Sequence, residues 1–307
     1  MNIIRMSGGI GNQMFQYALY LKLTSLGREV KFDDVTEYAL DNARPIMLSV
    51  FGIDYPRATS EEIIEITDGS LHFADRVRRK LFGRRSRQYT EKTLGYDEEV
   101  MGKESAYLCG CFQSEKYFKD IEGKVREAFR FRQVQIPGDI ARQIRDYEEQ
   151  IEKDTSISLH IRRGDYLQVS EVYGGICTEA YYEKAIEYMT EKYPESHFFV
   201  FTNDTPWADA WCEEKKAANK KLNFTVIKGT KEDTGYIDLM LMSKCKHHII
   251  ANSSFSWWGA WLNASLDKCV IAPVKWLNTC EVHDIFTPDM VRIDAYGKID
   301  FGHRTGL

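Results

Sequence analysis

Apolar positions along the chain follow two spacings, one typical of strands and one typical of helices. The first apolar run, "NIIRMS" at 2–7, predicts a strand, and the glycine turn "GGIGNQ" follows it. Residues 14–27 then show the spacing of an amphipathic helix that ends near Gly27, and 28–34 predicts a second strand. A strand, a helix and a strand in this order predict a parallel sheet.

Residues 36–105 carry a weaker pattern. "SEEIIEI" at 60–66 predicts a helix with Ser60 as its N-cap. The segment "RVRRKLFGRRSR" at 76–87 is strongly basic, and we expect it to be a solvated helix face. The alternative is that it contacts anionic lipid or a polyanionic acceptor.

The rest of the first half predicts a strand and a short helix over 106–118, helical structure over 121–132 and a charged helix over 139–155. That charged helix leads to a strand ending at His160, so we place a domain boundary near residue 150.

The second half alternates between helices and strands throughout. The expected helices are 181–193, 206–218, 235–245 and 255–266, and the expected strands are 197–204, 223–229, 246–254 and 268–276. This alternation is typical of a doubly wound nucleotide-binding domain. The predicted fold is therefore α/β, with two Rossmann-like domains, 1–150 and 151–307, facing a cleft.

Composition narrows the classes of protein that fit. Of 307 residues, 43% are hydrophobic and 28% charged, which indicates a soluble globular protein. The net charge of −5 argues against a nucleic-acid-binding protein. The N-terminus lacks the apolar stretch of a signal peptide, and no run of about 18 apolar residues predicts a membrane-spanning helix. We expect a cytoplasmic protein whose membrane contact, if any, is peripheral at the inner face.

Seven cysteines are present, without a CxxC pair or zinc-type spacing. We expect reduced thiols, with Cys109 and Cys111 sharing the buried face of one strand. We expect no metal site.

The turn that contains Gly9 and Gly11 resembles a dinucleotide-binding loop, since Asp33 or Asp34 follows at about the distance of a ribose-binding acid. The pattern fails because Met14 stands where its third glycine belongs.

Two amides in the same turn, those of Asn12 and Gln13, suit a hydroxyl-rich ligand such as a sugar. The alternative is a tight turn that binds nothing.

A charged cluster follows the strand in "SISLHIRRGDY" at 156–166. On a strand, His160 and Arg162 would line one wall and Arg163 the other. Ligands bind at the carboxyl ends of strands in open α/β sheets, and the planar fork of arginine matches phosphate oxygens. Asp165 could orient an arginine or bind a ligand hydroxyl. The alternative is a structural Arg–Asp network.

A second anion site is predicted in "HHIIANSSFSWWGAWL" at 247–262. The polar run Asn252, Ser253 and Ser254 stands where a helix begins, and helix N-termini bind phosphate. Trp257 and Trp261 lie on one face of that helix and are expected in the core. Together with the arginines, this helix could hold a diphosphate without metal.

Four ordered motifs resemble those of glycosyltransferase family 11, the α-1,2-fucosyltransferases. They are "GGIGNQMFQYA", "HIRRGDY", "FVFTND" and "DLMLMSKCKHHIIANSSFSWWGAWLN". The resemblance covers nearly the whole chain except 36–105, which is expected to help select the acceptor.

The resemblance implies a GT-B-like fold and GDP-β-L-fucose as donor, without a cofactor or metal. It implies inverting transfer to the 2-hydroxyl of a terminal β-galactoside, on an oligosaccharide or a glycolipid-linked acceptor. The N-terminal domain would hold the acceptor and the C-terminal domain the donor. It also suggests a bacterial enzyme acting on surface polysaccharide precursors.

The resemblance also implies roles for individual residues. Arg162 would bind the β-phosphate, His160 would lie near the diphosphate or fucose, and Asp238 would recognise guanine. The expected catalytic residues are Arg162, His160, Asp165 and Asn12. The expected donor-binding residues are Arg162, Arg163, Asn203, Asp204, Asp238, Asn252, Ser253, Ser254, Gly9 and Gly11.

Several alternatives stay open. The general base could be Asp165, His160 or Asp204, or a dissociative transfer could need little base. The rival functions are a fucosyltransferase of α-1,6 linkage, an NAD(P)-dependent oxidoreductase and a non-catalytic sugar-binding module.

Overall fold

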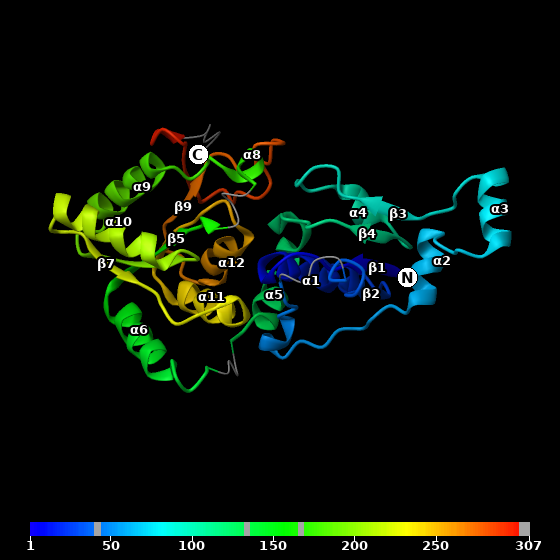
Figure 1. Ribbon diagram of the computed structural model, residues 1–307, viewed down its shortest axis with the longest axis horizontal. Coiled ribbons are helices and arrows are strands. Elements are labelled where there is room, and N and C mark those ends of the chain that lie inside the picture. The colour runs from blue at the N-terminus through cyan, green and yellow to red at the C-terminus, as the bar shows by residue number, and fades with distance from the viewer. Residues whose placement is uncertain (40–43, 132–135, 165–168, 301–307) are drawn as a thin grey trace. The chain divides into compact units, whose positions relative to one another are not determined.

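The computed structural model describes residues 1–39, 44–131, 136–164 and 169–300. The chain divides into two compact units, unit 1 (Met1–Gln133) and unit 2 (Val134–Leu307), whose elements are labelled in Figure 1. Each unit is an α/β layer structure around its own sheet, which is parallel in unit 1 and parallel except for one strand pair in unit 2.

The two units divide between Gln133 and Val134, whereas the sequence predicted a boundary near residue 150. The difference lies in α6 (Ala141–Lys153), which packs against β5 (Thr155–Ile161) and α11 (Gly235–Lys244). Ile144, Tyr147 and Ile151 of α6 are buried there, so the helix belongs to unit 2.

Unit 1 contains a sheet of four described strands in the order β2-β1-β4-β3, and every pair is parallel. The strands are β1 (Asn2–Arg5), β2 (Val30–Asp33), β3 (Gln88–Thr90) and β4 (Tyr107–Cys109). The helices are α1 (Ile10–Ser25), η1 (Leu48–Phe51), α2 (Ser60–Thr67), α3 (Phe73–Phe82), α4 (Glu98–Gly102), η2 (Glu115–Tyr117), η3 (Lys119–Ile121) and α5 (Glu122–Ala128).

Three local expectations for unit 1 are corrected. Helix α1 begins at Ile10 rather than at residue 14, so Gly11, Asn12 and Gln13 lie in its first turn. Thr59 rather than Ser60 caps α2, in a capping box with Glu62. Strand β4 ends at Cys109, so Cys111 lies beyond the strand and the two thiols do not share a strand face.

Unit 2 contains a sheet of seven described strands in the order β11-β10-β9-β8-β5-β6-β7. Its strands are β5, β6 (Ser196–Thr202), β7 (Asn223–Val226), β8 (His247–Ile249), β9 (Val270–Pro273), β10 (Val291–Ile293) and β11 (Ile299–Asp300). Its helices are α6, α8 (Ser170–Tyr173), α9 (Glu179–Lys192), α10 (Thr205–Ala218), η4 (Glu232–Thr234), α11 and α12 (Ser254–Leu262). All pairs are parallel except β10 with β11.

The two faces of this sheet are covered by different helices (Figure 1). Alternate residues of β5, namely Ile157, Leu159 and Ile161, share one core with α9 and α10. The opposite face is covered by α6, α11 and α12. Burial on both faces explains why β5 carries no exposed residue.

The α/β class with a Rossmann-like unit in each half is confirmed by these sheets. The tryptophans predicted in the core are there, since Trp257 and Trp261 are buried. No helix in the described parts of the chain is long and apolar enough to cross a membrane. All seven cysteines lie in described segments, and none forms a disulfide.

One turn of unit 1 depends on a carboxyl group. Glu91 follows β3, and its carboxyl oxygens accept hydrogen bonds from the backbone N–H groups of Cys111 (2.7 Å) and Phe112 (3.1 Å). Phe112 has φ of 53°, a conformation that is costly for a bulky side chain. A Cβ at Gly110 would lie 2.6 Å from that of Glu91, so the close approach requires glycine.

Removal of this carboxyl should destabilise unit 1. We expect Glu91→Ala to lower the free energy of unfolding by roughly 2–4 kcal/mol, because two backbone N–H groups lose their acceptor. Glu91→Gln keeps an acceptor and should cost less. Urea denaturation at pH 7 measures both, and equal stability of the wild-type protein and Glu91→Ala would contradict the assignment.

The same carboxyl should make stability depend on pH. Burial raises the pKa of Glu91 from 4.5 to about 7, outweighing the two N–H donors. Between these values the folded state binds a proton that the unfolded state releases, so the stability contributed by Glu91 falls as pH rises from 4.5 to 7. The difference in unfolding free energy between the wild-type protein and Glu91→Gln should therefore decrease over that range. Parallel pH curves would be the contrary result.

Candidate active site

The strand order of unit 2 brings three predicted motifs to one edge of the sheet. Strand β5 lies between β6 and β8, and all three are parallel, so their carboxyl ends are adjacent. The chain leaves β5 toward β6 on one side and later returns to β8 on the other. This is the topological switch point at which open α/β sheets bind ligands. The three exits are 162–164, 203–204 and 250–253.

The end of β5 is joined to the end of β6 through Arg163. Its backbone N–H donates to Asn203 Oδ1 (3.0 Å), and its Nε lies 3.4 Å from Asp204 Oδ2. Its guanidinium also stacks 4.0 Å above the ring of Trp207. A Cβ at Gly164 would lie 2.3 Å from Asn203 Nδ2, so a larger residue there would displace the Asn203 side chain.

These contacts show that Arg163 belongs to an Arg–Asp network, the alternative raised from the sequence. Asp204 is engaged twice, since its Oδ1 also accepts from the backbone N–H of Trp207 as the N-cap of α10. Trp207 was missed as a partner of Arg163. The only signal in the sequence was an aromatic residue in the first turn of the helix after "FTND".

The structure separates the other residues of the charged cluster. His160 is buried, with its ring 5.8 Å from that of Phe255 in α12, and its carbonyl accepts from Tyr182 Oη (3.0 Å). Strand β5 ends at Ile161, so the expected alternation of His160 and Arg162 on one wall does not extend to Arg162. Arg162 is half-buried directly after the strand. Asp165 lies outside the described residues.

The end of β8 leads directly into α12. Ser253 is the N-cap of this helix, and no hydrogen bond joins its side chain to the amides of the first turn. Ser254 begins the helix and is half-buried. This N-terminus therefore presents backbone N–H groups and serine hydroxyls at the switch point, an arrangement that suits phosphate oxygens.

Asn252 holds the turn between β8 and α12 through buried side-chain contacts. It is buried, its Nδ2 donates to the carbonyl of Trp276 (3.1 Å), and its Oδ1 lies 3.5 Å from Cys177 Sγ. These contacts fix the backbone that enters α12. Asn252 therefore positions the N-terminus of α12, and its own side chain is occupied by these contacts.

The helix itself is held by buried polar contacts. Trp257 Nε1 donates to the carbonyl of Ile285 (2.7 Å). His248 of β8 lies between Ser158 of β5 (2.8 Å) and Asn263 after α12 (2.9 Å). This network connects the two strands of the switch point to the far end of the helix.

Asp238 lies in the first turn of α11, the helix that follows β7. In a strand–helix–strand unit this turn lies at the carboxyl edge of the sheet. Burial raises the pKa of Asp238 to about 7, against the effect of a hydrogen bond from Thr230. Its Oδ1 is buried and has no hydrogen-bond partner among the described residues. A carboxyl oxygen in that state is suited to accept from a ligand N–H.

The glycine turn of unit 1 is built around its own amides. Gln13 is buried: its Nε2 donates to the carbonyls of Gly8 and Pro45 and to Tyr38 Oη, and its Oε1 accepts from the backbone N–H of Met47. These contacts make Gln13 structural. Gly8, with φ of 71°, and Gly9, the N-cap, let the chain turn from β1 into α1.

Asn12 lies in the same turn and is half-buried. Its Oδ1 accepts from Gln113 Nε2 (2.9 Å), and its Nδ2 lies 3.4 Å from Cys111 Sγ. The turn held by Glu91 therefore also positions the partners of Asn12.

The acidic pair at the end of β2 is also structural. Asp33 accepts from Thr36 Oγ1 and Tyr107 Oη (2.6 Å each), and Asp34 accepts from Tyr55 Oη and Arg57 Nε. No group of three or more His, Cys, Asp or Glu residues that could hold a metal ion occurs in the described ranges.

Similarity to known proteins agrees with the motifs at these strand ends. Residues 1–294 match the family described as Glycosyl transferase family 11. An Escherichia coli α-1,2-colitosyltransferase is 33% identical over 288 residues, which is 92% of this chain and 94% of that protein. The E. coli O-antigen biosynthesis glycosyltransferase WbnK is 34% identical over 295 residues (88% and 93%).

A galactoside α-(1,2)-fucosyltransferase 1 of Saimiri boliviensis boliviensis is 25% identical over 297 residues, 94% of this chain and 73% of that protein. These similarities give no support to the oxidoreductase alternative. The motifs, the strand order and the match along residues 1–294 lead to one conclusion: the chain belongs to glycosyltransferase family 11 and is a glycosyltransferase.

Proposed function

We propose that this enzyme transfers L-fucose from GDP-β-L-fucose to the 2-hydroxyl of a terminal β-galactoside, with inversion and without a metal ion or cofactor. The observation that carries the proposal is the parallel pairing of β5 with β8, because Arg162 follows β5 and the N-terminus of α12 follows β8 at the same edge of the sheet. This edge can hold a diphosphate between a guanidinium and helix amides.

The α-1,2 linkage is supported by the names of relatives, which include an α-1,2-colitosyltransferase and a galactoside α-(1,2)-fucosyltransferase. Those names favour α-1,2 over the α-1,6 alternative. They also raise a second donor, because colitose is L-fucose without its 3-hydroxyl. A comparison of GDP-fucose with GDP-colitose as donors separates the two.

The reaction builds negative charge on the leaving diphosphate, which we place at the carboxyl edge of the unit 2 sheet. The bond between C1 of the sugar and the β-phosphate oxygen breaks, which leaves positive charge on the sugar ring and negative charge on GDP. The acceptor 2-oxygen forms the new bond on the opposite face of C1 and loses its proton. Fixed donors aimed at the leaving phosphate stabilise this transition state most.

We assign different roles to the two arginines. Arg163 is committed to Asp204 and Trp207, so it fixes the loop after β5. Arg162, the next residue to the strand, is the arginine that we assign to the β-phosphate. Ser253 and Ser254 would complete the phosphate site, and His160 would border the sugar.

The base that receives the acceptor proton stays open between His160 and Asp165. Asp204, the third candidate, has one carboxyl oxygen facing Arg163 and the other capping α10, so we assign it an orienting role. Asn12 of unit 1 remains the residue we propose for fucose or acceptor contact.

Loss of the phosphate-binding arginine should abolish most turnover. We expect Arg162→Ala to reduce kcat by about 10²–10³ or more, since a donor to the leaving group is lost. The assay is GDP release from GDP-fucose, with and without lactose, in EDTA. Arg145→Ala, at an exposed position of α6, is the matched control.

Lactose-stimulated release in EDTA by the wild-type protein supports the proposed reaction. GDP binding without release would mean that lactose is the wrong acceptor. Near-normal turnover of Arg162→Ala would contradict the assignment of Arg162.

Asp238 should decide the preference for guanine. Guanine offers N1–H and an amino group, both donors, to the ionised carboxylate. We expect Asp238→Asn to weaken GDP binding by roughly 10- to 100-fold, as for a lost hydrogen bond to a charged group. Isothermal titration with GDP and with inosine diphosphate, which lacks the amino group, measures this. Asp233→Asn, exposed in η4, is the control.

The pKa of Asp238 adds a pH dependence to that binding. Since GDP binds the ionised form, affinity should be highest above pH 7 and fall by up to about tenfold per pH unit below it. The Asp238→Asn variant should not show this change. An affinity that is independent of pH in the wild-type protein would exclude Asp238 from the guanine site.

A further inference from the structure

Helix α3 and Leu71, two residues before it, expose an unusual amount of apolar surface. The helix contains no buried residue. Large apolar side chains of the helix lie in solvent: the exposed fractions are 81% for Phe73, 69% for Leu81 and 72% for Phe82. Leu71, two residues before the helix, is 86% exposed. A solvated charged face, which the sequence led us to expect, would not concentrate these side chains in one place.

The apolar side chains form a stripe with cations beside it. Phe73, Val77 and Leu81 follow one another at intervals of four residues, so they lie along one side of α3. Arg76 and Lys80, also at an interval of four, lie next to that stripe, and both are exposed. Apolar residues and cations therefore occupy one continuous face, which we call the α3 face.

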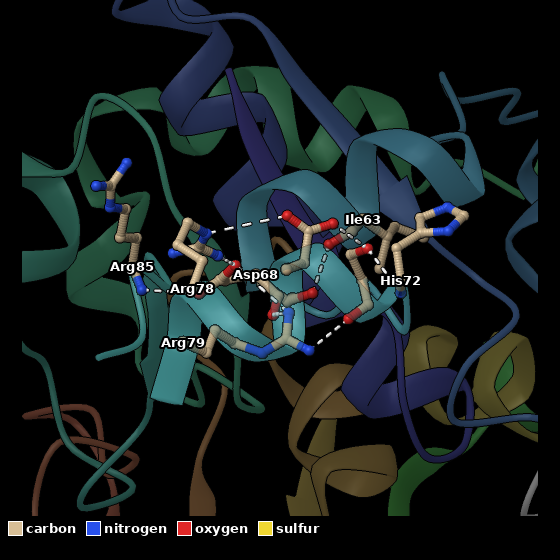
Figure 2. A network of polar contacts seen from close by, with 9 residues as sticks. Ile63, Asp68, His72, Arg78, Arg79 and Arg85 are labelled. Carbon is tan, nitrogen blue, oxygen red and sulfur yellow. Dashed lines mark hydrogen bonds and ion pairs between the residues drawn. The ribbon is translucent and has the colours of Figure 1, made fainter. Parts of the chain in front are cut away.

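The other side of α3 is anchored to the segment that follows α2 (Figure 2). Arg78 pairs with the carboxylate of Asp68, and Arg79 donates to the carbonyls of Asp68 and Ser70. The backbone N–H of Arg85 also donates to Asp68 (2.9 Å). The backbone hydrogen bond from Arg85 contributes most to lowering the pKa of Asp68. The hydrogen bond from Arg78 and the charges of Arg78 and Arg79 lower that pKa further.

The cations of the basic segment 76–87 therefore fall into two groups, one that anchors α3 and one that is exposed. Arg78 and Arg79 are structural, since they hold the helix against the turn at Asp68. Arg76, Lys80 and Arg84 are exposed and have no part in that network. The ion pairs of Arg78 and Arg79 with Asp68, on the opposite side of the helix, therefore orient the α3 face toward solvent.

We propose that the α3 face docks on an anionic lipid bilayer. Phenylalanine and leucine side chains on one side of a short helix enter the boundary between headgroups and acyl chains. Arginine and lysine beside them pair with anionic headgroups, which is notable in a chain whose net charge is −5. A purely polyanionic partner, such as an acidic glycan, would use the cations but would leave Phe73 and Leu81 in water.

This proposal goes beyond the sugar-transfer reaction and does not rest on it. Helix α3 lies in the segment between α2 and β3 of unit 1, while the proposed donor site is at the strand ends of unit 2. Vesicle binding requires no substrate, so failure of the donor assignment would leave the test intact.

The test is co-sedimentation of the full chain with phosphatidylcholine vesicles that contain roughly one third phosphatidylglycerol. We expect binding at about 50 mM salt that weakens at about 500 mM, and weak binding to vesicles of phosphatidylcholine alone. Two double variants should each lower the partition coefficient roughly tenfold or more: Phe73→Ser with Leu81→Ser, and Arg76→Glu with Lys80→Glu.

Matched controls separate the α3 face from general effects of charge and hydrophobicity. Lys220→Glu with Lys221→Glu makes the same charge change at exposed positions of unit 2. Leu266→Ser with Tyr296→Ser removes two other exposed apolar side chains. Neither control should change binding. The α3 variants should keep the wild-type melting temperature, because they remove no buried contact.

Three results would overturn the proposal. One is the absence of binding to anionic vesicles at low salt. Another is binding that the α3 variants leave unchanged. The third is a dimer in sedimentation velocity that the Phe73→Ser, Leu81→Ser variant dissociates, without vesicle binding; a second copy of the chain would then be what covers this face.

Discussion

Parallel pairing of β5 with β8 is the interaction on which the proposed donor site depends. Ile157, Ser158 and Leu159 pair with His247, His248 and Ile249, so the two strands end side by side. The pairing is reinforced by His248, which joins Ser158 to Asn263 in the buried layer beneath α12. A one-residue slip would turn Ser158 into the apolar layer and move the start of α12 away from Arg162.

The two units use a common device at their strand ends. In unit 2, Asp204 follows β6 and holds Arg163 of the neighbouring exit. In unit 1, Glu91 follows β3 and holds the backbone after β4. Each carboxyl group lies one or two residues past its own strand and fixes the turn of the strand beside it. Such contacts make the edges rigid before a ligand arrives, which reduces the ordering cost of binding.

Much of this architecture followed from local patterns. Apolar spacing predicted the main helices and the strands β5 to β9 of unit 2, and "HIRR" and "NSS" stood at strand ends. It did not predict α8, β10 or β11, which have two to four residues each. Other features depend on distant contacts. That Arg163 meets Asp204 and Trp207 follows from the pairing of β5 with β6, not from anything near Arg163 in the chain. Glu91 escaped notice because β3 has three residues, too few for a period.

The boundary near residue 150 was misplaced for a related reason. The spacing of α6 predicted the helix but carried no information on which sheet would bury it. The basic segment 76–87 could not be read from its composition either. Its many cations suggested a solvated helix face, whereas Arg78 and Arg79 form ion pairs with Asp68.

The pairing of β5 with β8 also has a consequence for biosynthesis. Ser158 and His248 are 90 residues apart in the chain. At about 5–20 residues per second, a ribosome needs roughly 5–20 s to deliver β8 after β5 has formed. During that interval β5 can already pair with β6, and β6 with β7, yet the other edge of β5 has no strand beside it. The nascent chain thus presents an open apolar edge until late in synthesis, which makes this step the one most exposed to misassociation and to chaperone capture.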